Sequence, residues 1–557
     1  MDLTKIPVVG KLIDRILSWR IFQFLVILPN QLLFWLVLIT GIVGGTVLPQ
    51  SVKTKAVNFG NAAKASTHAV NGFFGAGGGG TTGAKAVAVA AAHPSWAFNT
   101  TLVDTWSRLN FSTVITWWLW WSLVWLLMAG VGRGWCMVCP FGGFAEWVQR
   151  GALWKRKRRS IGLNLRWPRS LIRWGILPSV AAFIILTFIE EYYNISASAD
   201  PFTTGLLVIA IIALALIMHL VFERRTFCAY LCPLTAVFAP LGTVGMSARF
   251  HARDFDRCNT CPTKECLRGG VDGYECPWYD WPGNTSSTTM CGLCSECYKA
   301  CPYDNVGLYV EPPLSAVIAP GNRRIDIALA LIFGFGVITF MTVNATLWYT
   351  SLDQWLDSHT PFFTRYPNPV DYFGIVFATA LVVGIGIVGV RLVAGSTLLP
   401  AAAATERTII KITGVIKRWI KDWLVPLSYA AIPLVTADLI ANRTPTFLFY
   451  VPRIIQVISD PFGRNWNIFG TAHLRVVRSH LVSFSPIGLS GSALLIQLVI
   501  MGIGTLVSLW SMHRIYNNEL LMLSSRPLAG RVASLVFILV IGAVTAWFYF
   551  QIGGLAT

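Results

Sequence analysis

Long apolar runs recur along the whole chain, and they restrict its fold more than any other feature. A helix of about 20 residues crosses the roughly 30 Å hydrocarbon layer of a membrane. Runs of suitable length lie at residues 22–47, 111–131, 171–189, 203–221, 324–349, 370–392, 424–441, 491–511 and 532–550. We therefore predict an all-α polytopic membrane protein with about nine transmembrane helices.

The charge pattern indicates how these spans are oriented. The chain has 44 basic and 26 acidic residues, a net charge of +18, and only 13% of its residues are charged. Most of the basic excess lies in short loops between apolar runs, so we assign it to topology and lipid contact and expect no nucleic-acid partner. The basic loop 155–159 then lies in the cytoplasm. We expect a prokaryotic cytoplasmic (inner) membrane, with the N-terminus inside and the C-terminus outside.

Eight of the twelve cysteines lie between residues 258 and 301. From Cys291 onward the spacing is C-x2-C-x2-C-x3-C-P, as in bacterial ferredoxins, where the last cysteine ligates the other cluster of a pair. In the first half, which begins at Cys258, the cysteines are less regularly spaced, and this half ends with Cys276 followed by a proline. Three thiolates on one tight loop hold three irons of a cubane, and the fourth iron takes a distant cysteine. We therefore expect two [4Fe–4S] clusters, one on Cys258, Cys261, Cys266 and Cys301 and one on Cys276, Cys291, Cys294 and Cys297.

A pair of zinc sites is the alternative, because four thiolates also suit zinc. Zinc ribbons pair two C-x2-C hooks and need neither a third cysteine on one loop nor a trailing proline, so the spacing favours iron–sulfur. Every cysteine falls in a ferredoxin or C-P motif, which argues against a disulfide framework.

Four regions follow from these patterns. The first region, residues 1–21, carries apolar residues near helical spacing with basic residues between them, which predicts an interfacial amphipathic helix. It is followed by a first membrane domain of four spans, a small cytoplasmic 2[4Fe–4S] ferredoxin insert, and a second membrane domain of five spans. Their bounds are 1–21, 22–249, 250–312 and 313–557.

Two further cysteine pairs follow spans that run inward, and each pair ends in a proline: Cys136 with Cys139, and Cys228 with Cys232. All four thiols should lie at one membrane face. Four thiolates from two helix ends suit a third [4Fe–4S] cluster between the bilayer and the insert. Redox-active thiols are the second interpretation, and packing as small hydrophobes is the third.

His219 and Glu223 are four residues apart at the cytoplasmic end of the fourth span, so on a helix they share one face. Histidine beside a carboxylate is a suitable acceptor for the protons that quinol releases on oxidation. We predict both as quinol proton acceptors, with quinone as a further cofactor. Alternatively, His219 bonds a neighbouring helix and Glu223 pairs with Arg224 or Arg225.

We expect neither haem nor flavin. His473 and His480 are seven residues apart on one face, whereas two ligands of one haem come from facing helices. Thr82-Gly83-Ala84 is similar to the start of a flavin-attachment site, but Lys85 stands where the Ser or Thr acceptor belongs.

With two C-P cysteine pairs and a double-cluster insert, residues 110–310 resemble the NapH/NosR class of polytopic iron–sulfur membrane proteins. The segment from Arg225 to Leu234 is close to the C-x3-C-P motif of that class, whereas only two residues separate Cys136 from Cys139. The resemblance implies electron transfer between membrane quinol and a partner oxidoreductase, or service to the maturation of a metalloenzyme.

Two functions remain open at this point. The first is an electron-transfer subunit that links the quinone pool to a partner redox protein through [4Fe–4S] clusters. The second is a protein for maturation, reactivation or redox sensing of a metalloenzyme. Nine helices favour the first, because an anchor for a ferredoxin needs one or two. The chain has no Ser–His–Asp, H-E-x-x-H or nucleotide-binding signature that would indicate a self-contained enzyme.

Overall fold

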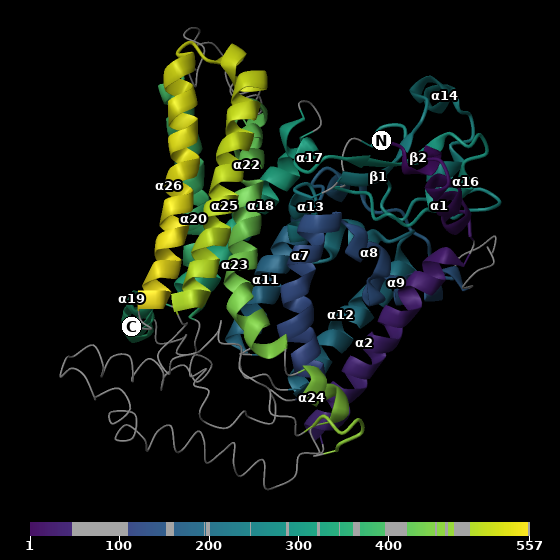
Figure 1. Ribbon diagram of the computed structural model, residues 1–557, viewed down its shortest axis with the longest axis horizontal. Coiled ribbons are helices and arrows are strands. Elements are labelled where there is room, and N and C mark those ends of the chain that lie inside the picture. Colours follow the sequence, from purple (N-terminus) through teal and green to yellow (C-terminus); the bar gives the residue numbers. More distant parts are fainter. Residues whose placement is uncertain are drawn as a thin grey trace.

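The structure, a computed structural model, is almost entirely helical (Figure 1). It describes residues 1–19, 21–46, 110–151, 161–193, 195, 201–245, 247–285, 289–319, 323–344, 346–359, 368–395, 420–451, 454–462, 466–472 and 491–554. Within these residues, eight helices are long and apolar enough to cross a membrane, as expected for a multi-pass membrane protein. They span Phe22–Val43, Phe111–Gly130, Pro201–Val221, Ile325–Val343, Pro369–Val393, Ile420–Leu448, Ala493–Leu523 and Pro527–Gln551.

The predicted count of nine is not confirmed by these eight. The difference falls on the predicted span 171–189, where the structure has the shorter helix α11 (Leu177–Tyr192, 16 residues). Gly175 adopts a left-handed φ of +55° just before it, and Pro178 occupies its first turn. Both features favour a helix that begins at Leu177 rather than at residue 171.

In the first membrane domain, α12 (Pro201–Val221) packs against α2 (Phe22–Thr46) and α9 (Pro140–Arg150). A third long helical segment runs through α6 (Phe111–Thr113), the π-helix η3 (Val114–Trp120) and α7 (Trp121–Val131). Gly132, with a φ of +66°, ends α7 and turns the chain into α8 (Gly134–Val138). The remaining short helix is α10 (Arg169–Ile172).

The insert is closed by a two-stranded antiparallel sheet. Strand β1 (Ser247–Ala252) pairs with β2 (Val306–Glu311), with Phe250 opposite Leu308. The sheet therefore brings the two ends of the insert together. The insert also contains the short helices α14 (Phe255–Thr260), α15 (Glu265–Arg268) and α16 (Glu296–Ala300). The π-helix η4 (Phe227–Leu231) and α13 (Thr235–Leu241) precede it, and α17 (Ser315–Ile318) follows it.

The N-terminal segment lies on the insert. It forms η1 (Leu3–Lys5) and α1 (Val9–Leu17), which is shorter than the predicted 1–21. The N-terminal amine donates to the Val310 carbonyl at 3.0 Å, and the Tyr298 hydroxyl donates to Asp14. Leu17 packs in the core of the insert, whereas Leu12 is exposed on the other face of α1.

The second membrane domain contains α18 (Ile325–Val343), α19 (Leu347–His359), α20 (Pro369–Val393), α25 (Gly491–Ile515) and α26 (Pro527–Gly554). A sixth segment runs through η5 (Ile420–Leu424), α22 (Val425–Ala430) and α23 (Ile432–Tyr450), so it is longer than the predicted span 424–441. Arg443, which follows the predicted span 424–441, therefore lies in a helix. The short elements are α24 (Ile454–Ser459), η8 (Tyr516–Leu520) and η9 (Leu521–Leu523).

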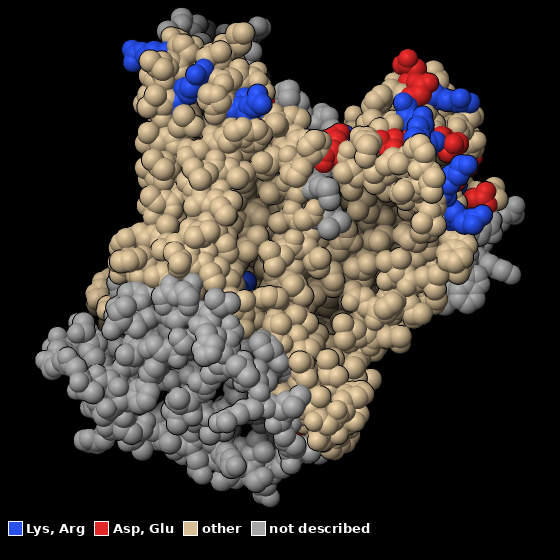
Figure 2. Space-filling model, in the orientation of Figure 1, with Lys and Arg blue, Asp and Glu red and all other residues tan. Residues whose placement is uncertain are grey.

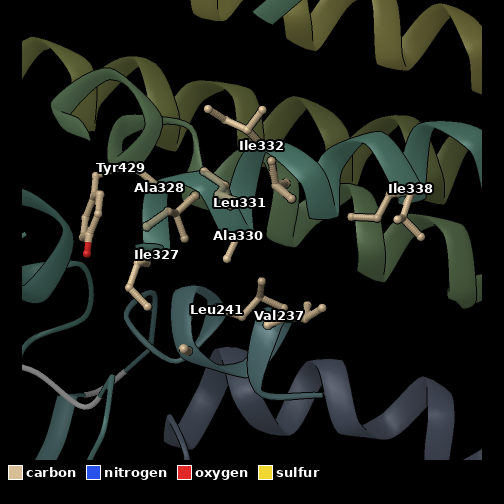
Figure 3. Packing of buried hydrophobic residues seen from close by; sticks show 14 of the residues in the cluster. Val237, Leu241, Ile327, Ala328, Ala330, Leu331, Ile332, Ile338 and Tyr429 are labelled. Carbon is tan, nitrogen blue, oxygen red and sulfur yellow. The ribbon is translucent and has the colours of Figure 1, made fainter. Parts of the chain in front are cut away.

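The largest apolar core joins the two membrane domains. Val237 and Leu241 of α13 face Ile327 and Leu331 of α18 (Figure 3). Lipid tails are as apolar as these side chains, so close packing rather than transfer from water holds helices together in a membrane. Small residues permit such packing between α18 and α20, where a Cβ on Gly336 would lie 2.7 Å from the Val376 carbonyl oxygen.

The charges are distributed as a membrane protein requires. In Figure 2 the middle of the molecule is almost free of charged side chains. These side chains gather over the insert and at the ends of α25 and α26 that lie on the same side of the molecule as the insert. The two termini lie at opposite ends of the molecule, the N-terminus beside the insert (Figure 1).

Candidate metal centres

Two helix ends bring the four cysteines of the C-P pairs together; we call them the membrane set: Cys136, Cys139, Cys228 and Cys232. Cys136 lies in α8, and Cys139 directly precedes α9, whose first residue is Pro140. Cys228 lies in η4, and Cys232 ends that helix. Proline suits a first helical position because that residue's N–H has no partner in the helix.

Each of the thiols Cys228 and Cys232 has its pKa raised by other thiols of the membrane set. Burial raises the pKa of Cys232 to about 12, and the thiols of Cys139 and Cys136 raise it further. Burial also raises the pKa of Cys228, against the effect of Arg225, and the other three thiols add to the rise. The four thiols therefore lie close enough to affect one another, and ligation of a cluster stays a prediction.

Gly142 leaves room beside this set. A Cβ at this position would lie 2.9 Å from Cys228 Sγ and 3.4 Å from Arg225 Nη1. Because carbon and sulfur do not approach so closely, any other residue here would displace the Cys228 thiol. The glycine is therefore part of the pocket that holds the four thiols.

The proximal set, Cys276, Cys291, Cys294 and Cys297, lies in the part of the insert nearest the membrane domain. Burial raises the pKa of Cys297, and the thiols of Cys294, Cys276 and Cys291 raise it further. Leu293 and Ser295 both adopt left-handed φ values, of +57° and +61°, which curl the backbone between these cysteines.

The distal set, Cys258, Cys261, Cys266 and Cys301, lines one pocket at the surface of the insert together with Arg257, Lys264, Trp281, Tyr303 and Asn305. Asn305 Nδ2 donates to Cys258 Sγ at 3.3 Å, and its backbone N–H donates to Cys301 Sγ at 3.4 Å. Burial alone would raise the pKa of Cys261, but hydrogen bonds from Lys264 and Thr263 outweigh it and lower that pKa. Such hydrogen bonds stabilise a thiolate and help set the potential of a bound cluster.

The three sets adjoin one another in order. Cys266 of the distal set and Cys297 of the proximal set belong to one buried cluster of side chains. Cys276 and Cys294 of the proximal set pack against Cys136 of the membrane set. The twelve cysteines therefore form a continuous series from the membrane domain to the surface of the insert.

A buried ion pair between Arg225 and Glu146 lies beside the membrane set. Arg225, which is fully buried, donates through Nε to Glu146 Oε2 at 2.9 Å, and its Nη2 also contacts that oxygen. Burial alone would raise the pKa of Glu146, but Arg150 and Arg225 outweigh it and hold that pKa below its usual value. Gln23 Nε2 also donates to Glu146, at 3.1 Å. We did not predict Glu146, although it is the one acidic residue in the short helix after Cys139.

Arg225 also joins the membrane set to the proximal set. Its Nη1 donates to the Cys136 carbonyl at 2.9 Å, and its guanidinium lies 4.9 Å from the centre of the Trp278 ring. Its charge acts on the thiols of Cys228 and Cys294, one from each set. Trp278 packs on Gly292, where a Cβ would lie 2.4 Å from the ring. One cation thus lies between two groups of thiols.

A second buried arginine, Arg133, also joins the insert to the membrane domain. Arg133 Nη1 donates to the Thr289 carbonyl of the insert at 2.7 Å, and Nη2 donates to Thr235 Oγ1 at 3.2 Å. The Thr235 hydroxyl in turn donates to the Cys228 carbonyl at 2.7 Å. The insert is therefore attached to the membrane domain at two points that both involve the backbone of the membrane set.

His219 and Glu223 are not arranged as predicted. Helix α12 ends at Val221, so Glu223 lies beyond the helix and does not share a helical face with His219. His219 is fully buried, Nδ1 lies 2.7 Å from the Ala215 carbonyl oxygen, and Nε2 has no hydrogen-bond partner. The acidic residue whose charge acts on His219 is Glu146. The Glu223 carbonyl accepts from Tyr279 at 2.8 Å.

The donor atoms fit iron–sulfur clusters, because each set consists of cysteine sulfur alone, the ligand of [4Fe–4S] cubanes. Within the described ranges, no group of three or more His, Cys, Asp and Glu side chains is arranged to hold a single metal ion. The tripeptide at 82–84, His473 and His480, considered for flavin and haem, lie outside the described residues.

Comparison with known proteins agrees with this assignment. Residues 113–161 and 204–248 match the family model of a 4Fe-4S binding domain. No curated protein and no solved structure matches the chain. The matched segments contain all four cysteines of the membrane set, whereas the insert lies outside them. The chain is thus similar to 4Fe-4S binding domains in its membrane part, which supports at least one [4Fe–4S] cluster and a role in iron–sulfur electron transfer in a multi-pass membrane protein.

Proposed function

We propose that this protein is a membrane-bound electron-transfer subunit that links the quinone pool to a partner oxidoreductase. The observation that carries the proposal is the position of Arg225, which contacts Glu146, the Cys136 backbone and Trp278 between two sets of thiols. Bound [4Fe–4S] clusters supply one-electron transfer. The three cysteine sets described above would hold three such groups in a row.

The membrane set supports a third cluster rather than a disulfide or simple packing. Its four thiols come from two separate helix ends, and Gly142 is needed to leave room for one of them. A redox disulfide needs only two cysteines, and packing alone needs no glycine beside a thiol.

The distal set supports a partner that docks on the insert. Its pocket is lined by Arg257, Lys264 and Glu265, and Tyr303 beside it is 40% exposed. The Arg257 guanidinium stacks on the Tyr303 ring at 5.0 Å. An acidic redox protein would find these two cations beside the partly exposed Cys261 and Cys301.

His219 and Glu146 support a quinol site beside the membrane set. The Nε2 atom of His219 is buried without a partner, so it is able to accept a proton from a bound quinol hydroxyl. Gln149 Nε2 donates to the His219 carbonyl at 2.6 Å and fixes this end of α12 against α9. Glu146, in place of Glu223, is the carboxylate whose charge acts on His219, and the charge of Arg225 acts against it.

The topology we propose has nine crossings, with α11 as a short ninth. The backbone N–H of Ile176, just before α11, donates to Asp326 at the start of α18, and Tyr372 of α20 donates to the Ile184 carbonyl. Helix α11 therefore begins level with α18. Nine crossings place the N-terminus and the insert in the cytoplasm and the C-terminus outside, in a prokaryotic inner membrane.

Iron analysis tests the number of clusters. We expect about twelve irons per chain in the intact protein and about eight in a Cys136→Ser, Cys228→Ser double variant. Equal values of about eight in both would remove the third cluster. Zinc without acid-labile sulfide would contradict the whole assignment.

Copurification separates the two functions considered. A stoichiometric oxidoreductase partner in gently solubilised membranes supports the electron-transfer subunit. A transient, substoichiometric metalloenzyme partner would instead support maturation, reactivation or sensing.

A further inference from the structure

A buried pair of ionisable side chains joins α23 and α26, in the second membrane domain. The Tyr549 hydroxyl lies 2.8 Å from Asp438 Oδ1 and 2.9 Å from the Asp438 carbonyl oxygen, so it is able to donate to either. Asp438 is completely buried and Tyr549 is 1% exposed. The other carboxyl oxygen, Asp438 Oδ2, has no hydrogen-bond partner.

Among the residues that the structure describes, no cation is paired with this carboxyl. Arg443 lies on the same helix, but its charge acts on Glu190 and Glu191 of α11 and on Tyr549. Its Nη2 contacts Met341 Sδ at 3.4 Å, and its guanidinium lies 6.0 Å from the Trp121 ring. In the part of the chain that the structure describes, Tyr549 is the one ionisable side chain that acts on Asp438.

An ionised carboxylate in an apolar interior, without a cation or several donors, is far less stable than the neutral acid. A neutral carboxyl suits the observed contacts, because it accepts from Tyr549 through Oδ1 and carries its proton on the unpartnered Oδ2. Ionisable groups within membrane helices also mark ion and proton pathways.

A row of ionisable groups leads from this pair to the surface. Arg443 interacts with Tyr549 on one side and with Glu190 and Glu191 on the other. Glu191 is partly exposed at the end of α11, and the nearby Tyr193 is 55% exposed.

We propose that Asp438 is a proton-binding site, held between α23 and α26 and connected to the end of α11 through Arg443 and Glu191. The ligand is the proton itself, exchanged with water at the end of the molecule opposite the insert. This site is independent of the proposed electron-transfer role, since none of its residues contacts a cysteine set.

Infrared spectroscopy of the full-length protein in lipid nanodiscs tests the proposal directly. At neutral pH we expect absorption from a protonated carboxyl that moves to lower wavenumber in D2O. Asp438→Asn, which keeps the volume and the Tyr549 contact, should remove it. Tyr549→Phe should move it to higher wavenumber, because one hydrogen bond is lost. Glu519→Gln is the matched control: Glu519 is paired with Arg323 at 2.6 Å, so its loss should leave this absorption unchanged.

The connection to water is tested by the rate of deuterium exchange. We expect Glu191→Gln to slow the D2O shift of the Asp438 band several-fold without removing the band. A carboxyl absorption that is identical in wild type, Asp438→Asn and Tyr549→Phe would overturn the site. An unchanged exchange rate in Glu191→Gln would overturn the connection. The Tyr549→Phe spectrum provides a second reading of the site if Asp438→Asn fails to fold.

Discussion

The guanidinium of Arg225 lies 4.9 Å from the centre of the Trp278 ring, and this contact joins the membrane domain to the insert. Arg225 follows the fourth span, whereas Trp278 follows Cys276 and a proline of the proximal set. A desolvated cation over an indole ring contributes on the order of 2 kcal/mol. The same arginine donates to the Cys136 carbonyl, so one side chain fixes the distance between two groups of thiols.

Replacing Arg225 should change cluster potentials. A reduced cluster carries more negative charge than an oxidised one, so a nearby cation favours reduction. We expect Arg225→Gln to lower the potentials of the membrane and proximal sites by on the order of 100 mV, and Arg225→Lys to lower them less. Redox titration followed by EPR measures this. Arg257 is exposed beside the distal set, so Arg257→Gln should shift only the distal site, and by less, because solvent screens its charge. Equal shifts at all three sites would contradict a local effect.

Removing one partner of the buried ion pair should destabilise the protein. Glu146→Gln leaves Arg225 and Arg150 facing a neutral amide, and we expect a loss of about 3–5 kcal/mol in the free energy of unfolding. Asp304→Asn is the matched control, because Asp304 pairs with Arg253 at 2.8 Å but is 84% exposed. That variant should lose about 1 kcal/mol or less. Unfolding in denaturant, followed by tryptophan fluorescence, compares the two; similar losses would show that burial of the Glu146 pair is unimportant.

Gly142 should be required for iron at the membrane set. In Gly142→Ala the added Cβ would lie 2.9 Å from Cys228 Sγ, so the thiol must move. We expect loss of the iron of one cluster, with the proximal and distal sites retained. Gly130→Ala is the control, because a Cβ on Gly130 meets nothing within 4 Å. Iron and labile sulfide per chain provide the measurement, and full iron in Gly142→Ala would show that the pocket tolerates a methyl group.

Reduction by quinol should depend on His219 and not on Glu223. We expect His219→Gln to slow quinol-driven cluster reduction at least tenfold, about 1.4 kcal/mol in the barrier, because Nε2 no longer accepts the proton. Reduction by dithionite, which needs no proton acceptor, should be unchanged in the same variant. Glu223→Gln should behave as wild type, since Glu223 lies outside α12. Loss of quinol-driven reduction in Glu223→Gln alone would restore the original assignment.

Local spacing was sufficient for part of this structure. The spans could be predicted from apolar runs because a helix in lipid satisfies its own backbone, whatever its neighbours are. The two cysteine groups of the insert could be proposed because three cysteines of each set lie close together along the chain, and in the structure the cysteines of each set lie near one another. The start of α11 could not be predicted, because a left-handed Gly175 and its contact with Asp326 place it.

Tertiary structure alone decided what surrounds those residues. The meeting of Cys136 and Cys139 with Cys228 and Cys232 depends on the packing of α9 against α12, since Cys136 and Cys228 are 92 positions apart along the chain. The partners of Arg225 and Asp438 come from helices far apart in sequence, at Glu146 and Tyr549. Charge, burial and hydrogen bonding at these sites are properties of several helices together. Residue spacing along the chain was therefore enough to predict the positions of the thiols and the spans. Only the packing of several helices determined which charged side chains lie beside them.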